Sequence, residues 1–269
     1  MASVRPAAIA GTFYPGRADE LARSVDAMLL AATPVTAAPV PKAIIVPHAG
    51  FIYSGPVAAS IYALIAPARA HIERVVLLGP THRVAVHGVA LPGVDAFSTP
   101  LGTVPIDFAS VKKLMALPYA GASAEAHRME HSLEVQLPFL QKVLDEFTLL
   151  PLAVGRASAQ QVATVLELLW GGDETLVVIS SDLSHYLPYA DAQKVDNGTA
   201  QAILDLRTDI SHQQACGATT INGLTLLAQQ RGLKPQLIDL RSSGDTAGDK
   251  ARVVGYGAFA FYESRHTPH

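Results

Sequence analysis

Four apolar segments of this chain are each followed at once by polar residues, and this pattern constrains the fold more than any other feature. The segments are residues 43–46 (AIIV), 74–79 (RVVLLG), 175–180 (TLVVIS) and 236–240 (QLIDL). Short apolar runs bounded by proline, glycine or polar residues are typical of strands buried on both faces. The polar residues that follow are, in chain order, His48, His82, Asp182 with His185, and Asp245.

Segments with helical composition alternate with these runs, at residues 19–32, 57–66, 108–115, 159–169, 190–206 and 212–230. Alternating strands and helices predict an α/β fold with a mostly parallel central sheet flanked by helices. Residues 252–262 alternate in polarity and are expected to form a closing strand, antiparallel and at the edge. No linker or repeat interrupts the chain, so we expect a single domain over residues 1–269.

Composition excludes several classes of function. The chain is 49% hydrophobic and 16% charged, with a net charge of −3, which is not the footprint of a nucleic-acid-binding protein. No run of about 18 apolar residues predicts a membrane span. The single cysteine, Cys216, forms no internal disulfide and is expected to be a small buried hydrophobe, which fits a cytoplasmic location.

Two histidines and one carboxylate are predicted to meet at one edge of the sheet. The carboxyl ends of parallel strands share an edge, and ligands bind there in open α/β sheets. His48, His82 and Asp245 would then form a set that suits non-haem Fe(II) and that Zn or Cu would also accept. The alternative is that each histidine only caps its strand end through a hydrogen bond.

His185 lies in the segment SSDLSHY, where Asp182 could orient it for general acid/base catalysis. His185 could instead be a fourth metal ligand, or Asp182 could cap a helix and leave His185 on the surface. Tyr53 and Tyr186 flank the two histidine segments and could donate hydrogen bonds to a substrate, or could simply pack.

His131 and Glu134 belong to a helix expected over residues 127–144, which Pro138 kinks or begins. Residues three apart share one helix face. We therefore consider a role for this pair in contacting substrate or supporting the metal ligands, against the alternative of a surface ion pair.

These motifs together resemble the Memo family, called protein B of the AmmeMemoRadiSam system in bacteria and archaea. The matching segments are AGTFYP (10–15), VPHAGFIYSGPVAA (46–59), LLGPTH (77–82), EHSLEVQLPFL (130–140), SSDLSHY (180–186), SGD (243–245) and VVGYGAFAF (253–261). The resemblance implies a fold similar to that of class III extradiol dioxygenases, which use Fe(II).

By this resemblance His48 and His82 would be metal ligands and His185 the catalytic histidine. Asp245 falls where animal members have a cysteine at the metal site, although Asp249 is only four residues away. Two functions are implied: an Fe(II)-dependent oxidoreductase of dioxygenase type, or a non-catalytic, metal-handling partner of a radical-SAM protein. Bacterial members also occur beside an AMMECR-type protein.

Overall fold

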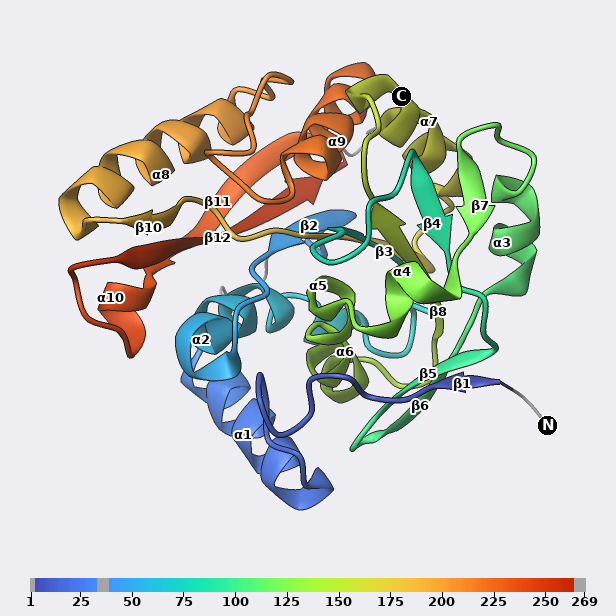
Figure 1. Cartoon of the computed structure of the whole chain (residues 1–269), viewed down its shortest axis with the longest axis horizontal. Coiled ribbons are helices and arrows are strands. Elements are labelled where there is room, and N and C mark those ends of the chain that lie inside the picture. Colours follow the sequence, from blue (N-terminus) through green and yellow to red (C-terminus); the bar gives the residue numbers. More distant parts are fainter. Residues whose placement is uncertain (1–2, 33–38, 264–269) are drawn as a thin grey trace.

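A nine-stranded sheet runs through the residues described by the computed structural model, which are 3–32 and 39–263 (Figure 1). Its centre has the order β2 (Ala43–Val46), β9 (Thr175–Ser180), β3 (Arg74–Pro80), β8 (Thr148–Val154), and all three of these pairings are parallel. The predicted α/β fold with a parallel central sheet is therefore confirmed.

The two flanks of the sheet are mostly antiparallel. On one side, β4 (Val89–Leu91) pairs with β8 in the antiparallel sense and with β7 (Ala120–Ala122) in the parallel sense. On the other side, β12 (Val253–Tyr262) runs antiparallel to β2. It is antiparallel as expected but is not an edge strand, because β11 (Lys234–Ser242) and β10 (His185–Leu187) both pair with it.

Side chains of the central strands alternate between two buried cores, as the two-residue period of a strand requires. On β3, Val75 and Leu77 enter the first core and Val76 and Leu78 the second. The first core is closed by α1 (Ala18–Ala31), α2 (Phe51–Tyr62) and α6 (Leu137–Val143), and the second by α7 (Ala159–Leu169) and α9 (Ala218–Arg231). Figure 1 shows α7, α8 (Tyr189–Leu204) and α9 on one side of the sheet and α1, α2 and α6 on the other.

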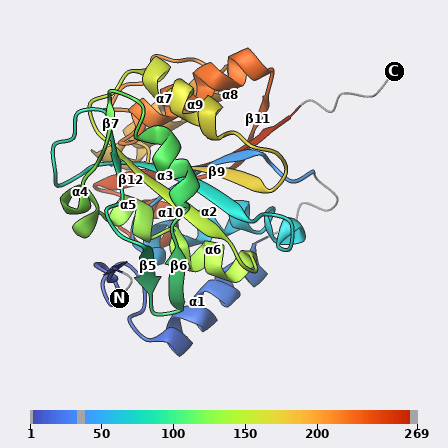
Figure 2. The same ribbon diagram turned by 90° about the vertical axis from the view of Figure 1, so that its right-hand side faces the viewer.

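Shorter elements complete the fold. A small separate sheet joins β1 (Val4–Arg5), β5 (Ala96–Thr99) and β6 (Gly102–Pro105), near the N-terminal end of the chain in Figure 2. Asp107 accepts a hydrogen bond from the backbone N–H of Ser110 and so caps α3 (Phe108–Leu114). A 3₁₀ turn, η1, covers Ala66–Ala68, and α10 covers Ser243–Thr246.

The helix expected over residues 127–144 is in fact three short helices: α4 (Ala124–Arg128), α5 (His131–Glu134) and α6. Pro138 lies in the first turn of α6, where its missing N–H costs no hydrogen bond. The carboxylate of Glu130 caps α5 by accepting from the backbone N–H of Ser132. These breaks turn His131 towards the carboxyl ends of the central strands.

The predicted domain boundaries of 1–269 include residues 1–2, 33–38 and 264–269, which lie outside the described residues. In the described part of the chain, no helix has both the length and the apolar character needed to cross a membrane.

Candidate metal centre

His48 lies two residues after the end of β2 and is 1% exposed. The hydroxyl of Ser180 donates to the carbonyl of Ser132 at 2.6 Å, so its oxygen accepts from Nδ1 of His48, which lies 2.9 Å away. This places the ring proton on Nδ1 and leaves Nε2 without a proton. Burial, and then the neighbouring His82 and His131, lower the pKa of His48 well below its usual value. His48 is therefore a neutral, oriented imidazole.

His82 follows β3 and is oriented by Glu130, a carboxylate that is 2% exposed. Nδ1 of His82 lies 2.9 Å from Oε1 of Glu130, and the backbone N–H of His82 donates to Oε2 at 2.7 Å. Burial opposes the ionisation of Glu130, but its bonds to His82 and Ser132 outweigh burial and lower its pKa to about 2. A carboxylate behind a histidine in this way leaves Nε2 available to a metal.

His131 is the first residue of α5 and lies over the other two histidines. Its ring centroid is 4.4 Å from that of His82 and 5.4 Å from that of His48. On its other side the ring of Phe13 packs at 4.9 Å. Burial, followed by the proximity of His82, lowers the pKa of His131 to about 4. This ring is also neutral at physiological pH.

The candidate ligand atoms of these three histidines all lie within 4.8 Å of one another. Nitrogens that bind one metal at about 2.1 Å are at most about 4.2 Å apart, so only small side-chain rotations separate the three rings from a coordinating geometry. Three imidazole ligands suit Fe, Cu and Zn. The chain therefore holds a possible metal site made of His48, His82 and His131, with hydrogen-bonded support behind two of its ligands.

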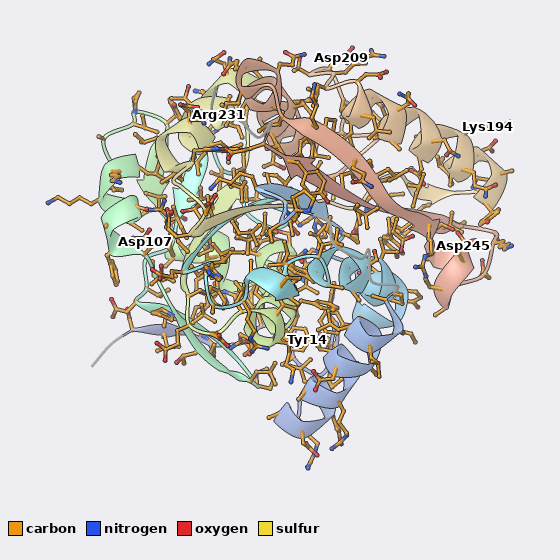
Figure 3. All side chains as sticks on the ribbon, turned by 180° about the vertical axis from the view of Figure 1, so that it is seen from behind. Tyr14, Asp107, Lys194, Asp209, Arg231 and Asp245 are labelled. Carbon is orange, nitrogen blue, oxygen red and sulfur yellow. The ribbon has the colours of Figure 1, made fainter. Side chains whose placement is uncertain are left out.

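The structure does not bring Asp245 into this group. Asp245 is an exposed residue of α10, and its carboxylate accepts from Tyr189 at 2.5 Å and from the backbone N–H of Ser242 at 2.8 Å. Figure 3 shows it at the outer end of the long β11–β12 pair. Asp249 is also exposed, and its carboxylate accepts from the backbone N–H of Ala251 at 2.8 Å.

Strand register explains this departure from the expected ligand set. Strand β11 does run in the same direction as β2, because both are antiparallel to β12. However, Ile45 of β2 is opposite Phe259, whereas Ser242 of β11 is opposite Gly255. Because β2 ends at Val46, one residue after Ile45, β11 ends three residues, or about 10 Å, beyond β2 and carries Asp245 past the histidines.

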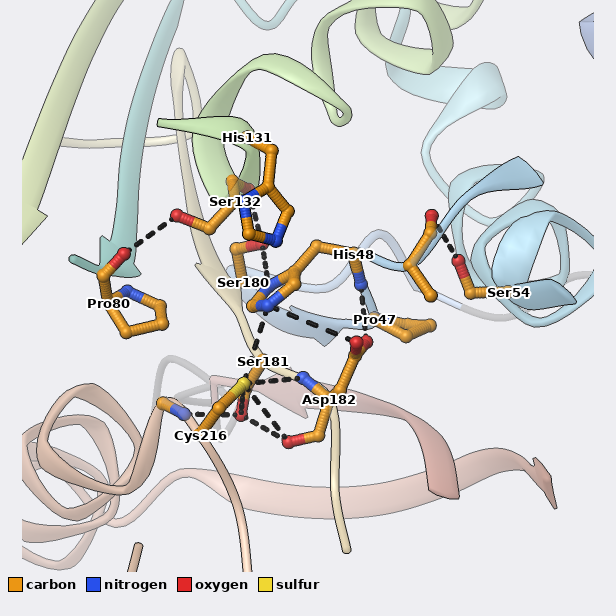
Figure 4. A network of polar contacts seen from close by, with 12 residues as sticks. Pro47, His48, Ser54, Pro80, His131, Ser132, Ser180, Ser181, Asp182 and Cys216 are labelled. Carbon is orange, nitrogen blue, oxygen red and sulfur yellow. Dashed lines mark hydrogen bonds and ion pairs between the residues drawn. The ribbon is translucent and has the colours of Figure 1, made fainter. Parts of the chain in front are cut away.

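Asp182 is 4% exposed. We expected it to contact His185, but it contacts His48 instead. Its Oδ1 accepts from the backbone N–H of His48 at 2.6 Å, and its Oδ2 lies 4.0 Å from Nε2 of His48 (Figure 4). Burial raises the pKa of Asp182 to about 7, because it outweighs the hydrogen bond from His48, which acts to lower this pKa. His185 is instead oriented by the carbonyl of Leu183, 2.8 Å from its Nδ1, and burial lowers its pKa.

Glu134 is not at the site. It is fully buried and binds Arg5 at 2.6 Å, the hydroxyl of Tyr14 at 2.6 Å and the backbone N–H groups of Ala8 and Ile9. Its role is structural, because it ties the N-terminal segment to α5. It is neither the substrate contact nor the surface ion pair that the sequence suggested.

Tyr53 and Tyr186 are 39% and 62% exposed, at the start of α2 and on β10. Both lie close enough to buried Tyr256 to influence its ionisation, as Asp182 does. Tyr186 has a φ of 60°, which is uncommon for a residue other than glycine, and Arg252 lies 5.2 Å from its ring centroid. Both tyrosines are therefore exposed side chains.

Cys216 is a residue whose position the sequence did not reveal. Its Sγ lies 3.3 Å from Nε2 of His48 and accepts from the backbone N–H of Asp182 at 3.3 Å (Figure 4). Burial, then the charge of Asp182, raise its pKa to about 12, so it is a protonated thiol. No spacing signal links residue 216 to residue 48, because the contact depends on how α9 approaches the end of β9.

Comparison with known proteins supports one family. The family model described as "Memo-like protein" matches residues 5–260. A MEMO1 family protein of Aquifex aeolicus is 38% identical, with 96% of this chain and 99% of the relative covered. A MEMO1 family protein of Ignicoccus hospitalis is 35% identical, with 96% and 98% covered.

A crystal structure of an uncharacterized protein from Escherichia coli K12 is similar with a TM-score of 0.50. The match covers 82% of this chain and 99% of the Escherichia coli chain. Because the two sequences are only 11% identical, the similarity is informative about the fold alone. The sequence matches extend over nearly the whole chain and include the segments that carry the three histidines. These matches show that the chain belongs to the Memo family.

Proposed function

We propose that this protein is a non-haem, Fe(II)-dependent oxidoreductase of dioxygenase type, with His48, His82 and His131 as its metal ligands. The observation that carries the proposal is the convergence of three imidazoles whose ligand atoms lie within 4.8 Å of one another. The choice of iron over Zn or Cu rests on the resemblance to extradiol dioxygenases. Bound Fe(II) would supply the redox chemistry that amino-acid side chains lack.

The residues around the histidines would handle protons. Because Nδ1 of His185 lies 2.8 Å from the carbonyl of Leu183, its ring proton is held there and Nε2 can accept a proton from a substrate hydroxyl. Asp182, with a pKa of about 7, is present in both protonation states at neutral pH and can serve as a second acceptor or donor. Tyr53 and Tyr186 would line the substrate side of these groups.

The test is metal content after purification without oxygen, followed by EPR of the nitric oxide adduct after loading with Fe(II). Wild-type protein should hold about one iron and give an iron–nitrosyl signal. We expect His48→Ala and His131→Ala each to lose both. Asp245→Ala should keep both, because its carboxylate is committed to Ser242 and Tyr189.

His71→Ala is the matched control, since His71 is an exposed histidine near the opposite end of the strands. If Asp245→Ala lost iron and His131→Ala kept it, the ligands would be His48, His82 and Asp245, as the sequence predicted. If folded wild-type protein bound no iron, the proposal would fail in favour of a non-catalytic role beside a radical-SAM protein.

A further inference from the structure

A cavity of about 880 Å³ opens beside the histidine cluster, between the end of β8 and the start of α9. Its wall includes Cys216 and one histidine of the cluster, His82, so it borders the candidate metal centre. The volume is typical of a small-molecule pocket. A cavity of about 970 Å³ lies at the opposite end of the strands, beside Lys42 and Thr175, and contains none of the three clustered histidines.

The charge of the cavity wall is one-sided. Its ionisable lining residues are His82, His87, Arg156, His212 and Cys216, and no aspartate or glutamate is among the described residues that line it. Arg156 is permanently charged, and a metal on the neighbouring histidines would add further positive charge. The cavity is therefore built for a ligand with negative charge.

Backbone pairing fixes Arg156 in the wall. The N–H of Arg156 donates to the carbonyl of Val86 at 2.8 Å, and the N–H of Gly88 donates to the carbonyl of Arg156 at 2.8 Å. His87 and Arg156 are partners in this short bridge. The two backbone segments can come this close only because residue 155 is glycine. A Cβ at that position would lie 2.1 Å from the Val86 carbonyl oxygen. The guanidinium thus starts from a rigid backbone position.

The guanidinium of Arg156 has no hydrogen bond or ion pair to any other described residue. Two other exposed arginines, by contrast, are paired: Arg207 with Asp209 at 2.6 Å, and Arg231 with Glu167 at 2.8 Å. An arginine presents a planar fork of donors that matches the two oxygens of a carboxylate or phosphate. Arg156 is therefore available to such a group in a ligand.

We propose that this cavity binds a small substrate that carries a carboxylate or phosphate group, with the oxyanion on Arg156 and the oxidisable end towards His82. The orientation of the substrate, with its oxidisable end towards His82, rests on the function proposed above. The binding of an oxyanion by Arg156 is independent of that function. Substrates of this class would be organic anions and not neutral ring compounds.

The experiment compares protocatechuate with catechol, since protocatechuate is catechol with one added carboxylate. Dissociation constants are measured by calorimetry without oxygen, for Fe(II)-loaded and for metal-free protein. Wild-type protein should bind protocatechuate about tenfold more tightly than catechol, the effect of one charge-assisted hydrogen bond at a partly open site. Arg156→Gln should remove this preference and leave catechol binding unchanged.

Arg207→Gln, which removes an exposed arginine outside the cavity, is the matched control and should keep the preference. Benzoate and phenyl phosphate, added as competitors, identify which oxyanion binds more tightly. Equal binding of the two phenols by wild-type protein, or a preference that survives Arg156→Gln, would overturn the inference. Metal-free protein separates the two proposals: Arg156-dependent preference there supports this one even if the protein takes up no iron.

Discussion

Burial keeps several histidines of this protein in the neutral state. For His48 and His131 this state is the one that a metal requires, and the absence of a proton to displace favours binding. His127 shows the same physics away from the cluster. It is 2% exposed, its Nε2 lies 2.9 Å from the carbonyl of Ala90, and burial lowers its pKa to about 4.

His127 should make the folded state sensitive to acid. The unfolded chain binds a proton at this histidine near its ordinary pKa of about 6.5, whereas the folded chain does so only near a pKa of about 4. Stability is therefore complete above the unfolded pKa and falls as pH drops between the two values, by about 1.4 kcal/mol per pH unit. Urea unfolding of metal-free protein at a series of pH values measures this slope.

His127→Gln is the comparison, because a glutamine amide can still donate to the carbonyl of Ala90. Between about pH 6 and about pH 4.5, the free energy of unfolding of this variant should depend less steeply on pH than that of wild-type protein. The difference should correspond to about one proton fewer taken up on unfolding. Identical slopes in the two proteins would mean that His127 is already protonated in the folded state. His48 and His131 contribute equally to both curves and so cancel.

Among the elements, the position of α5 relative to β3 decides whether three histidines meet. Gly79, next to the last residue of β3, lets α5 pack directly against the strand: a Cβ there would lie 2.8 Å from Oγ of Ser132 and 3.0 Å from Cδ2 of Leu133. The Ser132 hydroxyl also donates to the carbonyl of Pro80 at 2.9 Å. This close approach brings the ring of His131 over that of His82.

Gly79→Ala should push α5 away from β3 and weaken metal binding without touching a ligand. We expect a loss of about 1–3 kcal/mol in the free energy of unfolding, the usual effect of overpacking a core. We also expect a higher dissociation constant for Fe(II). Gly121→Ala on β7 is the control, since a Cβ at that position would have no neighbour within 4 Å. Unchanged iron affinity in a destabilised Gly79→Ala protein would show that α5 tolerates the shift.

The same packing explains what the sequence could and could not reveal about the site. His48 and His82 follow apolar runs, so the shared direction of parallel strands is enough to place them at one edge of the sheet. His131 was expected near a substrate, because its approach to His82 depends on Gly79 and on the breaks that isolate α5. Asp245 was expected with the histidines, because the sequence does not show how far β11 and β12 extend past β2. Pattern thus predicts strands and their parallel direction, but not register.

At the scale of the whole molecule, the histidine cluster joins three separate parts of the chain. His48 follows β2, His82 follows β3, and His131 begins α5, so their nitrogens meet only in the folded protein. A ligand that binds the folded state and not the unfolded one adds its binding free energy to the stability of the fold. A metal here would act as a cross-link between the central strands and the helical layer that carries α5.

Fe(II) should therefore stabilise the protein by a predictable amount. At a free concentration about 100 times the dissociation constant, the free energy of unfolding should rise by about 2.7 kcal/mol. Urea unfolding without oxygen, with and without Fe(II), measures the change. A variant that combines His48→Ala with His131→Ala should show no rise, whereas Asp245→Ala should show the full rise. Equal stabilisation of the double variant would place the bound iron elsewhere on the molecule, because no pair of these rings would then remain to hold it.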